Sequence, residues 1–240
     1  MATLAQSAAL SGPSPRTTAI ARKLRSAALQ GNQSKIRLLL TTLLEHPARR
    51  SDEWLRYQLG VLEDFSMTLH KLAFVDELTG LLNRRGFLRS AGRQHEQLRQ
   101  CQHGATLFYV DVDDLKQVND SLGHDAGDAM LREAANVLRK SFRARDVIGR
   151  LGGDEFAVLA ITKSPEDADF MLKRLAATID ACNAGRSGPP LSLSTGCVEC
   201  DPSERASLAE LLRAADCVMY GKKFSKLIDP DAESQIPSAA

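Results

Sequence analysis

The segment that decides the fold is Ala105-Thr-Leu-Phe-Tyr-Val-Asp-Val-Asp-Asp-Leu-Lys116, in which an apolar run leads directly into a group of acids. Apolar and aromatic residues dominate positions 105–110, and this composition predicts a buried strand. Asp111, Asp113 and Asp114 follow without a break. The strand therefore ends in a cluster of carboxylates, which makes its end a candidate functional site.

The complementary pattern stands at residues 152–161, where Gly152-Gly153-Asp154-Glu155 comes directly before an apolar run. Two glycines followed by two acids fit a tight hairpin turn, because glycine tolerates positive φ and the close approach of a ligand. If the two strands are neighbours, Asp111 meets Asp154 and Glu155. Like charges repel unless a cation lies between them, and oxygen ligands alone suit Mg²⁺. The alternative is that these acids are solvated loop residues.

Other elements surround these two segments. We predict a helix over residues 125–141, a second that opens at Ser164, a strand over residues 191–195, and a last long helix that opens with the capping box Ser207–Glu210. Strands interleaved with helices predict an α/β or α+β domain over about residues 75–228. The polar residues 229–240 predict a disordered tail.

The N-terminal part reads as helical. Residues 1–16 form an expected loose leader, and helical patterns run from there to residue 73. One stripe has nearly three heptads; its members are Leu55, Leu59, Leu62, Ser66, Leu69 and Ala73. This spacing is typical of a helix packed in a small bundle and equally of a two-chain coiled coil.

Composition excludes several classes of protein. The 240 residues are 43% hydrophobic and 25% charged, and no apolar run approaches a membrane span of roughly 18 residues. Five scattered cysteines predict a reducing, cytoplasmic setting, with Cys197 and Cys200 as ordinary strand residues rather than zinc ligands. The net charge of +1 combines +7 over residues 1–50 with −6 over the rest. We expect the basic part to serve helix solvation or docking, not nucleic-acid binding.

Five collinear segments carry a family resemblance. They are Asp76-Glu-Leu-Thr-Gly-Leu-Leu-Asn-Arg-Arg-Gly-Phe87, residues 111–128, Arg150-Leu-Gly-Gly-Asp-Glu-Phe156, Leu193-Ser-Thr-Gly196 and Ala215-Asp-Cys-Val-Met-Tyr220. In order and spacing they resemble the GGDEF domains, the diguanylate cyclases. The resemblance implies a GGDEF catalytic domain over residues 74–228. It also implies an α+β, palm-like nucleotidyl-cyclase fold, with a central, mostly antiparallel sheet flanked by helices. An all-α region, residues 1–73, precedes this domain.

The resemblance also implies a reaction, in which two GTP become cyclic di-GMP and two pyrophosphates. Each 3′-hydroxyl attacks the α-phosphate of the other nucleotide, assisted by Mg²⁺ or Mn²⁺. Asp111, the Val112 carbonyl and Asp154 are the implied metal ligands, and Glu155 assists the metal or the hydroxyl. The implied substrate-binding residues are Asp114, Leu115, Lys116, Asn119, Asp128, Gly152, Gly153, Lys223 and Lys226, with Asn119 and Asp128 reading guanine.

The chain departs from the family pattern at one place. The family has a glycine and then a basic residue after the position of Lys223, where this chain has Lys226 and Leu227. We expect this change to weaken the hold on phosphate and to raise the KM for GTP. Arg143-Ala-Arg-Asp146 matches the family's RxxD inhibitory site for cyclic di-GMP, with Arg174 as a secondary contact; an exposed ion pair is the alternative.

The implied cyclase is a homodimer, because one half-site holds one GTP and the product needs two. The heptad helix can deliver that dimer and pass on a signal from an upstream partner through residues 1–73. The competing hypothesis is a catalytically weak or silent receptor module for cyclic di-GMP or GTP, which keeps the RxxD site. The intact acids at Asp111, Asp154 and Glu155 argue for the enzyme.

Overall fold

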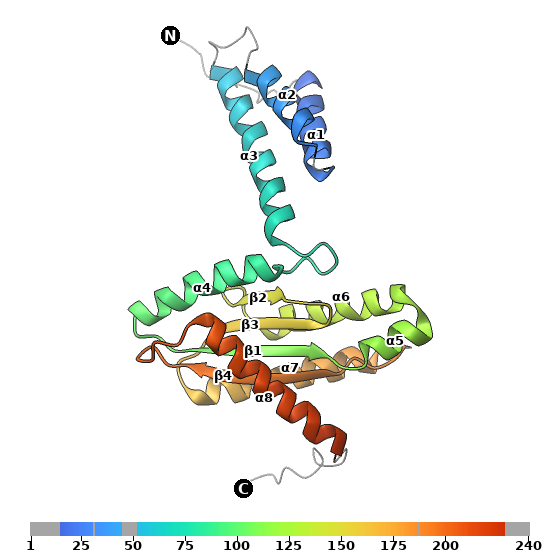
Figure 1. Ribbon diagram of the computed structural model, residues 1–240, viewed down its shortest axis with the longest axis vertical. Helices are drawn as coiled ribbons and strands as arrows, with labels where there is room; N and C mark the ends of the chain where they lie inside the picture. Colours follow the sequence, from blue (N-terminus) through green and yellow to red (C-terminus); the bar gives the residue numbers. More distant parts are fainter. Residues whose placement is uncertain (1–14, 31, 45–51, 187, 229–240) are drawn as a thin grey trace, which may run out of the picture. The chain divides into compact units, whose positions relative to one another are not determined.

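The computed structural model describes residues 15–30, 32–44, 52–186 and 188–228. The chain divides into two compact units, Met1–Ala73 and Phe74–Ala240. The expected leader, apart from its last residues, and the expected tail at residues 229–240 lie outside the described residues. Figure 1 labels the helices and strands of both units.

The first unit consists of three helices among the residues that the structure describes. They are α1 (Pro15–Leu29), α2 (Gln33–Leu44) and α3 (Asp52–Phe74). Leu24 of α1 and Val61 of α3 are buried, and Ile36 of α2 and Phe65 of α3 pack against them. The three helices therefore share one small apolar core, as burial of apolar stripes requires.

Helix α3 also carries apolar residues that this core does not use. Leu59, Leu62 and Leu69 belong to the heptad stripe and are 59%, 42% and 43% exposed. At 100° per residue, the stripe is centred about a quarter-turn away from Val61 and Phe65. We define these three leucines with Ser66 as the α3 stripe. Bundle packing thus uses a different face, and the described residues leave the α3 stripe largely exposed.

The second unit is built on a four-stranded sheet in the order β2-β3-β1-β4. The strands are β1 (Ala105–Val112), β2 (Val147–Arg150), β3 (Glu155–Ile161) and β4 (Leu193–Cys200), and the helices are α4 (Arg84–Gln100), α5 (Leu115–Leu122), α6 (His124–Ser141), α7 (Pro165–Ala184) and α8 (Leu208–Ile228). Every neighbouring strand pair is antiparallel. The predicted α+β fold with a mostly antiparallel sheet is therefore confirmed.

Alternating side chains of β1 separate two apolar layers. Phe108 and Val110 pack in one cluster with residues of α6 and α7. Leu107 and Tyr109 pack in the other cluster with residues of α4 and α8. Figure 1 shows α8 crossing one face of the sheet. The sheet is thus covered on both faces, which explains why β1 is buried along its whole length.

Helix α8 approaches the sheet unusually closely at Gly196 of β4. A Cβ atom at this position would overlap the carbonyl oxygen of Ala215 and the amide nitrogen of Met219. Only glycine leaves room for this contact of helix backbone on strand backbone. The close approach carries the last turns of α8 toward the end of β1, where the acids lie.

Two of the predicted elements show where sequence patterns succeed and fail. The capping box is confirmed, because Ser207 N donates to Glu210 Oε2 at 2.8 Å and Glu210 N donates to Ser207 Oγ at 3.3 Å. The strand predicted over residues 191–195 instead spans 193–200. Its start was placed too early because the backbone of Leu191 is bonded by the Asn183 side chain rather than by a strand.

The pair Cys197 and Cys200 behaves as ordinary strand residues. Cys197 packs against the cluster under α6 and α7, whereas Cys200 belongs to the cluster under α4 and α8. The two thiols therefore point to opposite faces of the sheet and cannot share one zinc ion. Among the described residues, no helix is long and apolar enough to cross a membrane.

Candidate active site

The pairing of β1 with β3 brings the two acidic segments together. Asp111 lies directly opposite Glu155 in the antiparallel register, and Val112 N donates to the carbonyl oxygen of Asp154 at 3.0 Å. Residues opposite one another in a sheet share a face, so the carboxylates of Asp111 and Glu155 project to the same side. The sequence-based expectation that these acids converge is met by the register.

Asp111 is the most enclosed acid of this group. Its side chain is 12% exposed and forms an ion pair with Lys223 of α8. Burial raises the pKa of Asp111, and the nearby charges of Asp154 and Asp113 act in the same direction against the opposing effect of Lys223. The pKa of Lys223 is also raised: its burial would lower it, but the Asp111 carboxylate outweighs that effect. The site holds negative charge that needs a cation.

Asp113 is a site residue that the sequence reasoning left without a role. Its carboxylate accepts hydrogen bonds from Ser192 Oγ at 2.6 Å and from Ser194 Oγ at 2.7 Å. Lys223 Nζ lies 3.8 Å from its Oδ1. The sequence could have indicated Asp113 as a site residue, because it is two positions after Asp111 and strand alternation places both side chains on one face.

The glycine turn between β2 and β3 is fixed by a neighbouring arginine. Gly152 leaves space for the Glu155 carboxylate, since a Cβ there would collide with Oε2 of Glu155. Arg150 donates to the Gly153 carbonyl from Nη2 at 2.6 Å and from Nε at 3.2 Å. Its Nη1 reaches Asp76 Oδ1 at 3.3 Å. Arg150 therefore ties the turn to the segment that follows α3.

Asp76 is in turn held as an anion. Burial would raise its pKa, but hydrogen bonds from Thr79 and the charge of Arg150 hold the pKa of Asp76 below its ordinary value. Thr79 donates to Asp76 Oδ1 from its backbone N at 2.9 Å and from Oγ1 at 2.6 Å. The sequence placed Asp76 in a family motif but gave no indication of this contact with Arg150.

Tyr109 is a second residue that the sequence did not single out. It lies on the same face as Asp111 and is one diagonal step from Glu155 in the β1–β3 ladder. Burial, and after it the hydrogen bond to Glu155, raise the pKa of the Tyr109 phenol. The phenol therefore stays protonated at physiological pH and can orient the Glu155 carboxylate.

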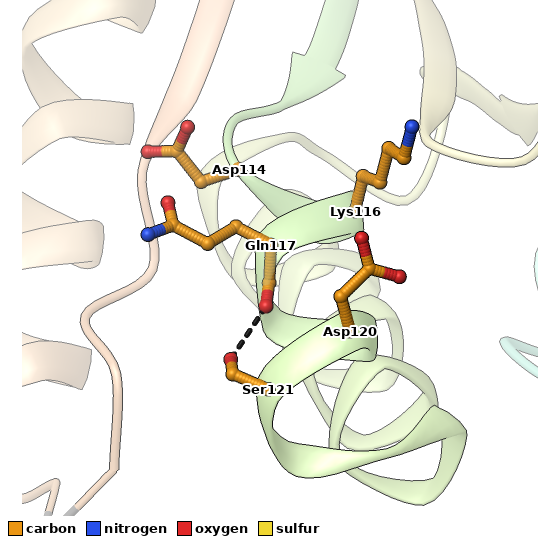
Figure 2. Close-up of a pocket in the computed structure, with 5 residues that line it drawn as sticks. All are labelled: Asp114, Lys116, Gln117, Asp120 and Ser121. Carbon is orange, nitrogen blue, oxygen red and sulfur yellow. Dashed lines mark hydrogen bonds between the residues drawn. The ribbon is translucent and has the colours of Figure 1, made fainter.

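The start of α5 follows directly on the acids at the end of β1. Asp114 adopts a left-handed conformation with φ of 57°, which turns the chain from β1 into the helix. Leu115 is buried, whereas Asp114 and Lys116 are exposed. A cavity of about 520 Å³ opens here, and Figure 2 shows its lining residues Asp114, Lys116, Gln117, Asp120 and Ser121. Backbone amides at a helix start, together with a lysine, suit an anion.

The two residues expected to read guanine lie on neighbouring helices. Asn119 of α5 contacts Gly127 of α6 so closely that a Cβ at Gly127 would collide with the Asn119 amide. Asp128 is the next residue along α6, half-buried, and 3.7 Å from Arg132 Nη2. The fold thus sets Asn119 against the residue that precedes Asp128, on the two helices joined by the turn at Gly123, whose φ is 86°.

The RxxD segment lies at the end of α6. Asp146 is 8% exposed, and its carboxylate accepts from Arg143 N at 2.8 Å and Ile161 N at 3.3 Å. Arg174 of α7 donates from Nε to the Ser141 carbonyl at 2.6 Å and stacks on the Phe170 ring at 5.7 Å. Its buried Nη2 has no hydrogen-bond partner among the described residues. Arg143 and Asp146 therefore do not form the exposed ion pair that was the alternative to an inhibitory site.

The remaining phosphate contact lies outside what the structure describes. Helix α8 continues through positions 226 and 227, but the side chains of Lys226 and Leu227 lie outside the described residues. Their expected effect on phosphate binding stays a prediction.

The donor set suits a hard divalent cation. Asp111, Asp154, Glu155 and the Val112 carbonyl offer oxygen ligands alone, the type that Mg²⁺ and Mn²⁺ prefer. Among the described residues, no group of three or more His, Cys, Asp or Glu side chains is placed so that it could hold a metal ion by itself. Mg²⁺ is usually held by one or two carboxylates and completed by water and substrate phosphates, so the ligand type of these acids, and not a preformed cluster, is what suits it.

Comparisons with known proteins agree with this geometry. A family profile described as "Diguanylate cyclase, GGDEF domain" matches residues 73–226. The probable diguanylate cyclase DgcC of Escherichia coli (strain K12) is 30% identical over 172 residues, which cover 71% of this chain and 46% of DgcC. The chain therefore spans less than half the length of this relative.

Two solved structures are similar at comparable levels. A microbial GGDEF domain whose interaction with bis-(3′,5′)-cyclic di-GMP was determined is 33% identical with a TM-score of 0.57, and the match covers 65% of this chain and 94% of that chain. Diguanylate cyclase SiaD of Pseudomonas aeruginosa, solved with its activator SiaC, is 31% identical with a TM-score of 0.58; the match covers 88% of this chain and 80% of SiaD.

Proposed function

Because the chain belongs to the GGDEF-domain family of diguanylate cyclases, we propose that it condenses two GTP into cyclic di-GMP and two pyrophosphates. In each half-reaction a 3′-oxygen forms a bond to the α-phosphorus of the other nucleotide, and the bond from that phosphorus to pyrophosphate breaks. The observation that carries the proposal is the convergence of Asp111 and Glu155 beside Lys223, next to the start of α5.

The residues divide the work of phosphoryl transfer, which consists mainly of positioning and charge neutralisation. Asp111, Asp154 and the Val112 carbonyl would hold Mg²⁺ or Mn²⁺, and the bound cation supplies charge neutralisation at the phosphates and a lower pKa for the attacking hydroxyl. Glu155, oriented by Tyr109, is placed to accept the proton of the 3′-hydroxyl. Lys116 and the amides at the start of α5 hold phosphates.

Guanine selectivity is assigned to Asn119 and Asp128. A carboxylate accepts from both N1–H and the exocyclic amine of guanine, whereas adenine lacks this pair of donors. A site built for such bonds rejects a nucleotide that leaves them unmade by up to about 10⁴-fold. The contact of Asn119 with Gly127, next to Asp128, supports a joint role for the two side chains.

A homodimer follows from the stoichiometry, since one site holds one GTP and the product contains two. The α3 stripe supports a parallel pair of α3 helices, because Leu62 and Leu69 are separated by one heptad and exposed. Such a pair would join two copies of the chain and so supply two half-sites.

Regulation is proposed at two places. Cyclic di-GMP would bind at Arg143, Asp146 and Arg174, and the unpartnered Nη2 of Arg174 supports an anionic or carbonyl-bearing ligand there. An upstream partner would act through residues 1–73. The second unit holds 167 of the 240 residues, about 70%, so the 88% match to SiaD extends into the first unit. SiaD was solved with its activator, which supports a protein partner for this unit.

The setting proposed for this activity is the cytosol. None of the five cysteines forms a disulfide, and Cys200 is buried, as expected of a protein kept in a reducing compartment. Because GTP is the proposed substrate, the protein must also work in a compartment that contains GTP.

The second candidate function is a silent receptor that binds cyclic di-GMP at the RxxD site without catalysis. The enclosed Arg174–Asp146 region supports it as well as it supports product inhibition. The complete set of acids and their shared face on the sheet favours the enzyme, because a receptor has no need to keep Asp111 buried against its desolvation cost.

Incubation of the purified protein with GTP and Mg²⁺ should yield cyclic di-GMP and pyrophosphate, detected by chromatography. Asp154→Asn should lower the rate by at least about 100-fold while circular dichroism and melting stay unchanged, since it removes charge without changing size. ATP should give no product. A protein that binds cyclic di-GMP yet forms none at micromolar concentration is a receptor, and an active Asp154→Asn variant removes the assigned metal role.

Charge placed on the α3 stripe should weaken self-association. Leu62→Glu with Leu69→Glu should raise the dimer dissociation constant at least about tenfold in sedimentation equilibrium, because two acids would face their own copies. Met67→Glu is the matched control, since Met67 is an exposed apolar residue of α3 outside the stripe. Equal effects of the control and the stripe variants would show that the stripe is not the dimer surface.

Product inhibition should depend on Arg143. Arg143→Ala should raise the concentration of cyclic di-GMP needed for half-inhibition at least about tenfold, because a charge-assisted contact to the ligand is lost. Arg145→Ala, an exposed arginine in the same turn, should leave it unchanged. Inhibition that persists in Arg143→Ala would place the inhibitory site elsewhere.

A further inference from the structure

Lys223 makes a contact that differs from its expected role. The resemblance assigns it to the nucleotide phosphates, but its ammonium group is paired with Asp111, the residue assigned to the divalent cation. An ammonium group and a divalent cation against the same buried carboxylate repel one another, because they are like charges a few ångströms apart. Each therefore weakens the binding of the other, and the pair is relieved if the ammonium group finds another partner.

Asp113 offers Lys223 a second ion-pair partner. Its Oδ1 is 3.8 Å from Lys223 Nζ, and its side chain is only 14% exposed. Both carboxylate oxygens are fixed by serine hydroxyls, Oδ2 by Ser192 and Oδ1 by Ser194. A carboxylate held rigidly by two donors costs little further ordering when it receives a lysine. Lys223, at 37% side-chain exposure, retains the freedom to move.

We propose that Lys223 is an internal counter-ion of Asp111, and that it shifts to Asp113 and the nucleotide phosphates when the divalent cation binds. Asp113 is then a positioning residue that acts through Lys223. The proposal rests on the proposed function, in which Asp111 binds the cation. It adds that one lysine serves two partners in succession.

The consequence is an order of binding. In the free protein Lys223 neutralises Asp111, so a divalent cation alone must displace an ammonium group and binds weakly. A cation that arrives together with GTP brings phosphates, which give Lys223 a new partner. The site therefore selects the cation–nucleotide complex over the free cation.

The first test measures Mn²⁺ binding without nucleotide, by calorimetry or by the paramagnetic resonance signal of free Mn²⁺. Lys223→Met should bind Mn²⁺ about tenfold more tightly than wild type, because removal of a unit charge within about 4 Å frees Asp111. Lys173→Met, an exposed lysine of α7, should match wild type. An unchanged or weaker Mn²⁺ affinity in Lys223→Met overturns the proposal.

The second test uses an α,β-methylene analogue of GTP together with Mn²⁺. Lys223→Met should bind the analogue more weakly, opposite in sign to its gain for free Mn²⁺. Asp113→Asn should weaken analogue binding at least about fivefold in the wild-type background and much less in the Lys223→Met background, as expected of residues in one network. Equal losses in both backgrounds would show that Asp113 acts on the cation directly and not through Lys223.

These measurements separate the two proposals. If wild type binds Mn²⁺ with the analogue but Lys223→Met gains nothing for free Mn²⁺, the counter-ion role fails and the cyclase proposal stands. If no variant binds Mn²⁺ even with the analogue, the metal site itself fails, and the counter-ion role fails with it.

Discussion

The antiparallel pairing of β1 with β3 is the constraint on which the rest of the site depends. It sets Asp111 opposite Glu155 and leaves both carboxylates on one face of a buried sheet. Such an arrangement is unfavourable without a compensating charge, because burial and the neighbouring acids both disfavour the ionised form of Asp111. Lys223 supplies that charge in the free protein. The fold therefore gathers like charges at this end of the sheet and supplies the compensating ammonium group from α8.

Helix α8 positions Lys223, and Arg150 holds the glycine turn between β2 and β3. The glycine at position 196 lets α8 lie against the sheet backbone, and this contact carries Lys223 to the end of β1. On the other side, Arg150 joins the carbonyl of Gly153 to the carboxylate of Asp76. Asp76 follows α3 by two residues. Arg150 thus anchors the glycine turn to the segment between α3 and α4.

Sequence patterns predicted the strands that carry the acids, because β1 and β3 are apolar runs bounded by polar residues and buried on both faces. They also predicted the convergence of Asp111 and Glu155. The Lys223–Asp111 pair could not be predicted, because the two residues are 112 positions apart and only the packing of α8 joins them. The serine bonds of Asp113 depend on how β4 begins, and that start was misplaced because a side-chain contact from Asn183 shapes it. The heptad spacing gave the α3 stripe, but only the structure shows that the bundle core uses another face.

The proposed activity requires Asp111 and its neighbours to bind a divalent cation together with GTP at the end of β1. Anomalous diffraction from crystals grown with Mn²⁺ and a non-reactive GTP analogue would locate that cation. We expect a manganese peak about 2.1 Å from an oxygen of Asp111 and from the Val112 carbonyl, in contact with the phosphates of the analogue. Nucleotide bound at the start of α5 with no manganese at Asp111 would contradict it.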